Sequence, residues 1–144
     1  MPNGPTPSVL AMLVCDQVIA EQGTNKRSLI GIFDNINSPA FPLQLRLAVY
    51  AKLSDAQGHY DFRLRFVNLR DERSVIPDIN IPLDIADTQN AAELAVNLLG
   101  IIISEPGAYE FQLWAGDAYL HRITLNAIQT GGLQWPQQPN FPRR

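Results

Sequence analysis

The segment from Leu43 to Leu53 alternates between apolar and more polar positions at every step. Its apolar positions are Leu, Leu, Leu, Val, Ala and Leu, and Gln, Arg, Ala, Tyr and Lys lie between them. A period of two places successive side chains on opposite faces of an extended strand, whereas a helix repeats every 3.6 residues. The pattern therefore predicts a strand with one face in a core and one in solvent.

The same period returns after the polar turn at residues 55–58. Apolar side chains from Tyr60 to Phe66 alternate with Asp61, Arg63 and Arg65. Pairing Ser54 with His59 would align four apolar pairs: Leu53–Tyr60, Ala51–Phe62, Val49–Leu64 and Leu47–Phe66. A slip by one residue would place arginines opposite leucines. We therefore expect an antiparallel hairpin of 43–53 with 60–67, in which Leu47, Val49, Phe62 and Leu64 are buried.

A second hairpin is expected near the end of the chain. Tyr109, Phe111 and Leu113 alternate with polar residues, and the same period resumes at residues 119–127. A three-residue loop, 116–118, begins with a glycine, which suits the positive φ of such loops. This loop aligns Phe111 with Ile123 and Tyr109 with Leu125. It also places Trp114 on the outer face, opposite Leu120.

The remaining apolar segments alternate less. Residues 9–19, 28–36 and 94–103 are apolar on both faces, as expected of strands that are covered on both sides or cross between sheets. Gly100 and the isoleucine run favour a strand over a helix at 94–103. Two prolines confine a strand at 79–85 to a sheet edge, and residues 86–93 allow one short helical turn. About seven strands with turns at short intervals predict a two-sheet antiparallel β-sandwich.

The motif Pro106-Gly107-Ala108-Tyr109 opens the last hairpin. In immunoglobulin-like sandwiches, a tyrosine just after such a corner donates a hydrogen bond back to the preceding turn. Tyr109 is either this corner tyrosine or an ordinary core residue.

The 144 residues fit one domain with two irregular ends. We expect an N-terminal arm at residues 1–8, a sandwich at 9–129 and a Pro- and Gln-rich C-terminal arm at 130–144. Proline lacks an N–H donor, so neither arm can enter a sheet ladder over any length. The apolar side chains Leu133, Trp135 and Phe141 would anchor the C-terminal arm, either on its own domain or on a neighbouring copy.

Charge and cysteine content limit the compartment and the partners. The net charge of −3 argues against binding to nucleic acid, which requires a basic face. Cys15 is the only cysteine, so no disulfide forms within the chain, and a reducing compartment is favoured. Residues 1–8 lack the basic residues of a signal peptide, and the apolar run 9–15 is too short to cross a bilayer. We expect a cytoplasmic protein without nucleic-acid or membrane partners.

Several of these motifs together resemble a known bacterial family. They are Cys15-Asp16-Gln17-Val18-Ile19, the run from Ser28 to Ile36, Phe41-Pro42 and Pro106-Gly107-Ala108-Tyr109. The family is known only as a domain of unknown function, made of short cytoplasmic proteins with an expected immunoglobulin-like sandwich. The resemblance spans roughly residues 9–128 and leaves the arms outside. It implies a fold, but no activity, substrate or catalytic residue.

The candidate residues for chemistry do not form a recognisable catalytic or metal-binding set. A nucleophilic cysteine needs a base, and no spacing rule brings His59 or His121 near Cys15. We therefore interpret Cys15 as a small buried hydrophobe. Asp34-Asn35 is typical of a turn. The sequence has no metal-ligand spacing and no Gly-rich phosphate loop, so we expect neither an enzyme nor a cofactor or metal.

Two surface features are candidates for binding a partner. Basic residues gather on the outer face of the first expected hairpin and in the turn after it; they are Arg46, Lys52, Arg63, Arg65, Arg70 and Arg73. The favoured interpretation is a solvated face balanced by Asp61, Asp71 and Glu72, and the alternative is a surface for an acidic partner or a phosphorylated ligand. Trp114 faces outward, and an outward aromatic marks an interface where the surrounding patch is apolar. Cover by the chain's own C-terminal tail is an equal alternative. The candidate partner-binding residues are Trp114, Leu120, Trp135, Phe141, Arg63 and Arg65.

Two functional hypotheses from different classes follow. The leading one is a non-catalytic protein-interaction or assembly module that binds a protein partner or associates with itself. The alternative is a small-ligand or carbohydrate-binding sandwich, with exposed Trp114 and Tyr50 as stacking platforms. An enzyme is the least favoured class, and the fold alone does not choose among the three.

Overall fold

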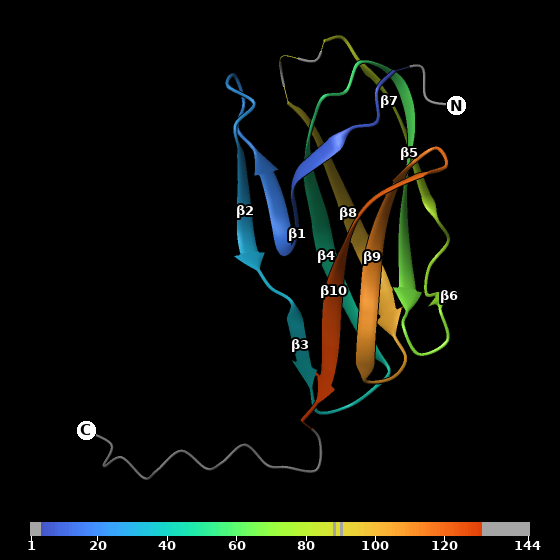
Figure 1. Cartoon of the computed structure of the whole chain (residues 1–144). Coiled ribbons are helices and arrows are strands. Elements are labelled where there is room, and N and C mark those ends of the chain that lie inside the picture. Colours follow the sequence, from blue (N-terminus) through green and yellow to red (C-terminus); the bar gives the residue numbers. More distant parts are fainter. Residues whose placement is uncertain (1–3, 88, 90, 131–144) are drawn as a thin grey trace, which may run out of the picture.

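The computed structural model describes residues 4–87, 89 and 91–130. The described residues form two facing β-sheets (Figure 1). Within this part of the chain, no helix is long and apolar enough to cross a membrane. The strands are β1 (Ser8–Ala20), β2 (Arg27–Ile32), β3 (Asn35–Ser38), β4 (Leu43–Ser54), β5 (Gly58–Asn68), β6 (Arg73–Ser74), β7 (Ile79–Ile85), β8 (Ala92–Ile103), β9 (Gly107–Ala115) and β10 (Ala118–Gln129).

The strand order is that of an immunoglobulin-like sandwich. The first sheet runs β2-β1-β4-β8, and the second runs β3-β10-β9-β5, with β6 and β7 beside the outer edge of β5. Strands β1-β4-β8 correspond to the order A-B-E, and β10-β9-β5-β7 to G-F-C-C′. All pairs are antiparallel except β3 with β10. This topology confirms the predicted all-β sandwich, and the proline-containing strand 79–85 lies at an edge as expected.

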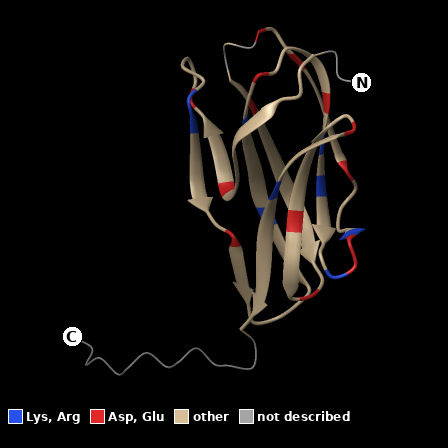
Figure 2. Cartoon of the chain, in the orientation of Figure 1, with Lys and Arg blue, Asp and Glu red and all other residues tan. Residues whose placement is uncertain are grey.

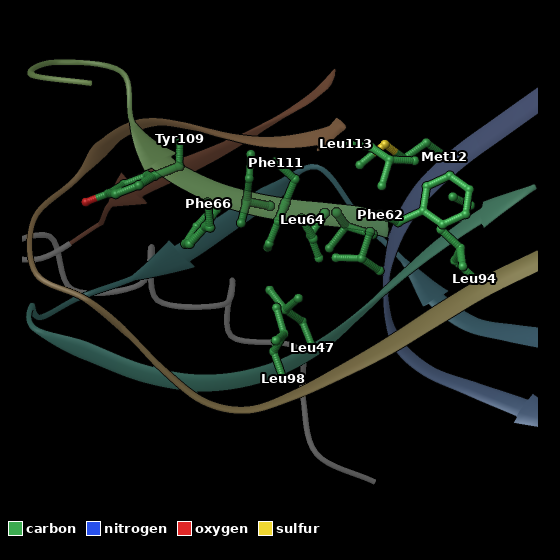
Figure 3. Close-up of a cluster of buried hydrophobic side chains, with 14 of the residues drawn as sticks. Met12, Leu47, Phe62, Leu64, Phe66, Leu94, Leu98, Tyr109, Phe111 and Leu113 are labelled. Carbon is green, nitrogen blue, oxygen red and sulfur yellow. The ribbon is translucent and has the colours of Figure 1, made fainter. Parts of the chain in front are cut away.

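The core lies between the two sheets. In Figure 3, Leu47 and Leu98 of the first sheet point toward Phe66 and Phe111 of the second. The rings of Phe66 and Phe111 stack with centroids 4.2 Å apart. Fully burying one such side chain stabilises the fold by about 1.5–3 kcal/mol. The period of two therefore supplies each sheet with one continuous apolar face.

The predicted hairpin of 43–53 with 60–67 is wrong in its pairing. The four marker residues are buried as expected, while Arg63 and Arg65 lie on the outer face. However, β4 pairs with β1 and β8, whereas β5 pairs with β9 and β7 in the other sheet. Facing sheets pack about 10 Å apart, so apolar faces match across the core as well as they match side by side. Alternation identifies the buried face but not the neighbouring strand.

The second hairpin has the predicted register. Phe111 pairs with Ile123 and Tyr109 with Leu125. Its loop is one residue shorter than expected, because Ala118 pairs with Ala115, and the extra residue enters a β-bulge at Leu120. The bulge turns Leu120 toward the core, against which it packs half-buried. The predicted opposition of Trp114 and Leu120 is therefore wrong, and Tyr119 lies opposite Trp114.

Strand β1 bends sharply at its middle (Figure 1). Its first half, up to Cys15, pairs with β4, and its second half pairs with β2. Residues 16–32 thus form a hairpin, called here the β1–β2 hairpin. At its base, Gly31 has φ 68°, and a Cβ there would lie 2.2 Å from Asp16 Oδ2. Both the backbone conformation and the close approach therefore require glycine.

The described part of the N-terminal arm packs on its own domain. Pro7 is buried, and the hydroxyl of Tyr60 donates a hydrogen bond to the carbonyl oxygen of Pro5 at 2.6 Å. The same hydroxyl accepts a hydrogen bond from the Gln57 amide at 3.0 Å. The anchors expected for the C-terminal arm, Trp135 and Phe141, lie outside the described residues, as do Thr88 and Asn90 in the segment where one helical turn was considered.

Candidate interaction surfaces

The outer face of the second sheet carries the predicted Trp114 and Arg63. These residues are paired in register on β9 and β5, and the Arg63 guanidinium carbon lies 5.1 Å from the centre of the Trp114 ring. Tyr119 packs edge-on against the same ring at 5.2 Å, and the indole nitrogen donates to Gln112 Oε1 at 3.3 Å. Trp114 is therefore half-buried by its own neighbours. It offers only part of its surface to a partner.

Of the predicted basic residues, Arg63, Arg65 and Arg70 lie close to carboxylates, whereas Arg46 and Lys52 are on β4 in the other sheet. Asp78 lies 3.9 Å from Arg63 Nε and 3.4 Å from Arg65 Nε. Arg70 pairs with Glu105 at 2.7 Å and with Asp71 at 3.5 Å. The sequence led us to expect Asp61, Asp71 and Glu72 as the balancing carboxylates, and of these Asp71 pairs with one of the arginines. The other pairings are with Asp78 and Glu105. Asp78 is available because the chain after β5 turns back and runs along the edge of β5.

Asp61 instead belongs to a histidine cluster at the opposite end of β5. His59 Nδ1 lies 2.7 Å from Asp84 Oδ1, and Nε2 lies 3.1 Å from Asp61 Oδ1. The hydrogen bond to Asp84, followed by that to Asp61, raises the pKa of His59 above its ordinary value. His59 therefore lies within hydrogen-bond distance of two carboxylates on an exposed strand end.

A hollow of about 940 Å³ lies on the same sheet, lined by Arg65, Gln112, Tyr119 and Arg122 among others. Glu110, a buried residue on the outer side of β9, also lines this hollow. It accepts a hydrogen bond from Gln112 Nε2 at 2.7 Å and lies 3.5 Å from Arg122 Nη1. Glu110 is thus satisfied by neighbouring side chains of the sheet itself, as a buried charge requires.

On the outer face of the first sheet, Tyr50 is buried, which corrects its expected role as an exposed platform. Its hydroxyl donates a hydrogen bond to the Glu93 carboxylate, and Arg27 lies 3.4 Å from Glu93. Burial and the bond to Glu93 raise the pKa of Tyr50 to about 12. Arg27 is on β2 and Glu93 on β8, with two strands between them in the sheet. Their contact therefore shows that the β1–β2 hairpin folds over this face.

Cys15 lies on the same outer face, paired with Ala48 of β4, and it is completely buried. Burial raises the pKa of its thiol. The expectation that Cys15 is buried is confirmed, although its side chain faces away from the core between the sheets and is covered on the outer side of the first sheet. The two histidines lie on β5 and β10 of the second sheet, so the fold does not bring them to Cys15. In the described part of the chain, no three His, Cys, Asp or Glu residues are grouped to hold a metal ion.

Asp34 lies in the connection from β2 to β3, where the sequence predicts a turn, whereas Asn35 is the first residue of β3. The main-chain oxygen of Asp34 accepts a hydrogen bond from the Asn126 amide at 2.9 Å. The side chains of Asn35 and Asn126 are 3.2 Å apart. These contacts join β3 to β10 and give the pair a structural role.

The β1–β2 hairpin exposes a group of isoleucines that the sequence analysis missed. Ile19 and Ile30 lie on the same face of the hairpin, and Ile32 is at its base; all three are exposed, and together they are called the isoleucine patch. Figure 2 shows charge only near the ends of the two hairpin strands. The sequence signal was present, because these segments are apolar on both faces, but we assigned both faces to the protein interior.

A second hollow, of about 620 Å³, lies between the hairpin and β8. Residues 16–18 line one side, Asn97 and Leu99 line the other, and Arg46 of β4 also contributes. The first sheet therefore presents an apolar hairpin, a hollow and the last strand of the sheet side by side.

The fold and the crossing connections define an immunoglobulin-like β-sandwich protein. Residues 10–128 match the family of unknown function DUF6941, and the chain belongs to this family. This confirms the resemblance found in the sequence. No curated protein matches the chain.

Two solved structures illustrate what the chain is similar to. An immunoglobulin-like protein from Pseudomonas aeruginosa is 11% identical with a TM-score of 0.44, covering 87% of this chain and 98% of its own. A β-glucosidase from Listeria innocua, in complex with isofagomine, is 10% identical with a TM-score of 0.40. That match covers 84% of this chain and 16% of the glucosidase.

Proposed function

We propose that this chain is a non-catalytic, cytoplasmic protein-interaction module that binds another polypeptide through the isoleucine patch of the β1–β2 hairpin. The observation that carries the proposal is the exposure of Ile19, Ile30 and Ile32 on a hairpin with few charges. Apolar groups gathered on one exposed surface are typical of interaction sites.

The energetics favour a polypeptide as the ligand. Burying the exposed parts of three isoleucines contributes on the order of 2–4 kcal/mol. A micromolar complex requires about 8 kcal/mol. The patch therefore acts as an anchor, and the partner must add further contacts of its own over a wider surface, as proteins do.

The alternative of a carbohydrate-binding domain receives less support. A stacking platform needs an open aromatic face. Arg63 and Tyr119 already pack against Trp114, and Tyr50 is buried beneath the hairpin. The separation of Cys15 from His59 and His121 also favours binding over catalysis.

The proposal is tested with the double variant Ile19→Lys/Ile30→Lys. The tagged full-length chain is used to capture partners from the cells that produce it, and each captured protein is then purified and titrated against the chain by calorimetry. We expect the double variant to bind at least about tenfold more weakly, because two charges replace the anchor.

Ile128→Lys is the matched control, since Ile128 is 43% exposed against 46% for Ile30 but lies on β10. Equal affinity of the double variant and the wild type would contradict the proposal. So would the failure of every captured protein to bind the purified chain.

A further inference from the structure

Strand β8 is the last strand of the first sheet and the longer of that sheet's two edge strands. It pairs with β4 along its length, and no other strand of the described residues pairs with its far side. The N–H and C=O groups on that side therefore have no ladder partner. Such an edge is a template for pairing with another strand.

The other edge strands carry features that oppose such pairing. β2 has six residues and begins with Arg27, β3 has four residues, and β7 contains Pro82 and Asp84. Short length, charge and proline all disfavour edge-to-edge association. β8 has twelve residues, contains neither proline nor lysine, and has Glu93 as its one charged residue.

Several apolar side chains of β8 are also exposed or only half-buried. Leu99 is 77% exposed and Ile102 is 55% exposed. Val96 lies opposite the core residue Val49, yet it is only half-buried. Leu99 and Gly100 together oppose Arg46 in a β-bulge, which interrupts the ladder near the end of the strand. A strand placed beside β8 would cover these positions.

The occupant must supply an extended segment, and this chain's own ends do not. Residues 131–144 contain Pro136, Pro139 and Pro142, so their longest proline-free run is the first five residues, two of which are glycines. The described part of the N-terminal arm is held by Tyr60 near the start of β5. The β8 strand of a second copy, in contrast, is long, apolar and free of proline.

We propose that β8 pairs antiparallel with β8 of a second copy, so that the two first sheets join into one continuous sheet across a two-fold axis. A two-fold arrangement makes the same edge serve both copies. Antiparallel pairing also keeps the two Glu93 carboxylates toward opposite ends of the joint, which avoids placing like charges opposite each other. The surface differs from the isoleucine patch, so this inference and the proposed function can fail separately.

The test measures the mass of the purified full-length chain by light scattering and sedimentation equilibrium over a range of concentrations. We expect a dimer for the wild type. For Leu99→Lys/Ile102→Lys we expect the dissociation constant of the dimer to rise at least about tenfold, because the lysines place charge along the shared edge. Thermal unfolding of each variant checks that the fold is retained. We expect it to be retained because both substituted side chains are exposed.

Ile32→Lys is the control, because Ile32 is exposed to the same extent as Ile102, 55%, but lies on the hairpin. It is expected to remain dimeric. A nitroxide attached to Asn97→Cys supplies the geometry, since paired strands are only about 4.8 Å apart and the labels of two copies would broaden each other's spectra. Cys15 is buried and does not compete for the label.

A wild-type chain that is monomeric at every concentration would overturn the inference. A dimer that survives both lysines, or one without spectral broadening at position 97, would also overturn it. Loss of the dimer in the Ile32→Lys variant alone would assign self-association to the isoleucine patch and exclude the β8 edge.

Discussion

The hydroxyl of Tyr109 donates a hydrogen bond to the main-chain oxygen of Glu105, 2.7 Å away and four residues upstream. Tyr109 is at the start of β9, immediately after the chain has crossed from the first sheet to the second. The Glu105 side chain accepts further hydrogen bonds from Asn68 Nδ2 at 2.9 Å and Arg70 Nε at 2.7 Å. One turn thereby holds the crossing connection against the end of β5.

Tyr109→Phe is expected to lower the free energy of unfolding by about 0.5–1.5 kcal/mol, the net contribution of one such hydrogen bond. The ring remains to fill the core, so the loss reports the hydroxyl alone. Urea denaturation measures it, with Tyr119→Phe as a control because Tyr119 is exposed. Equal stability of Tyr109→Phe and the wild type would show that the corner bond contributes nothing.

Gly31→Ala is expected to destabilise the protein by at least about 1 kcal/mol, because an L-residue at a positive φ is strained. The added methyl group also meets Asp16. Asp16→Ala should therefore recover part of the loss in the double variant, but not the strain. Gly100→Ala is the control in thermal unfolding, since its nearest neighbour would be Gln44 Nε2 at 3.7 Å. A Gly31→Ala variant as stable as the control would contradict the prediction.

The imidazole of His59 is expected to titrate above about 6.5, its ordinary pKa, because Asp84 and Asp61 accept its hydrogen bonds. A pKa raised by folding adds stability below the unfolded pKa, and that stability is lost as pH rises through the folded pKa. NMR titration of the wild type and of Asp84→Asn measures the effect. The pKa of His59 should fall in the variant. A wild-type value at or below 6.5 would contradict the cluster.

Cys15 is expected to react slowly with a thiol reagent under native conditions, because burial covers the sulfur and raises the thiol pKa. Absorbance of the released thiolate product follows the reaction. Ile32→Cys places a second thiol at an exposed position of the adjacent strand and should be modified at once. Wild-type labelling as fast as that of the second thiol would mean that the hairpin opens over Cys15 in solution.

The local sequence pattern was sufficient to predict strand pairing where the partner strand is close in sequence. The register of β9 with β10 follows from two alternating segments and a tight loop, because few conformations close so short a turn. The corner role of Tyr109 was recognisable as one of two alternatives from the Pro-Gly motif before it. The outward direction of Trp114 follows from the same parity.

Local pattern was insufficient where contacts join distant segments. Arg63 reaches Trp114 because β5 pairs with β9, about fifty residues later. Arg65 meets Asp78 through the return of the chain along β5. The isoleucine patch remained hidden because an apolar strand has the same composition whether the fold or a partner covers it.

The sequence by itself determined that this protein is a β-sandwich and, for the clearly alternating strands, which face enters the core and which outer positions carry charge, because side chains alternate along any strand. Only the tertiary structure decided which strands are neighbours, that β4 and β5 belong to different sheets, and that no described residue covers the far edge of β8 or the isoleucine patch. The physical reason is that an apolar face of one strand or sheet can be buried equally well against any other apolar face of matching shape. The choice among such faces depends on loop lengths, bulges and hydrogen-bond ladders acting together over the whole chain.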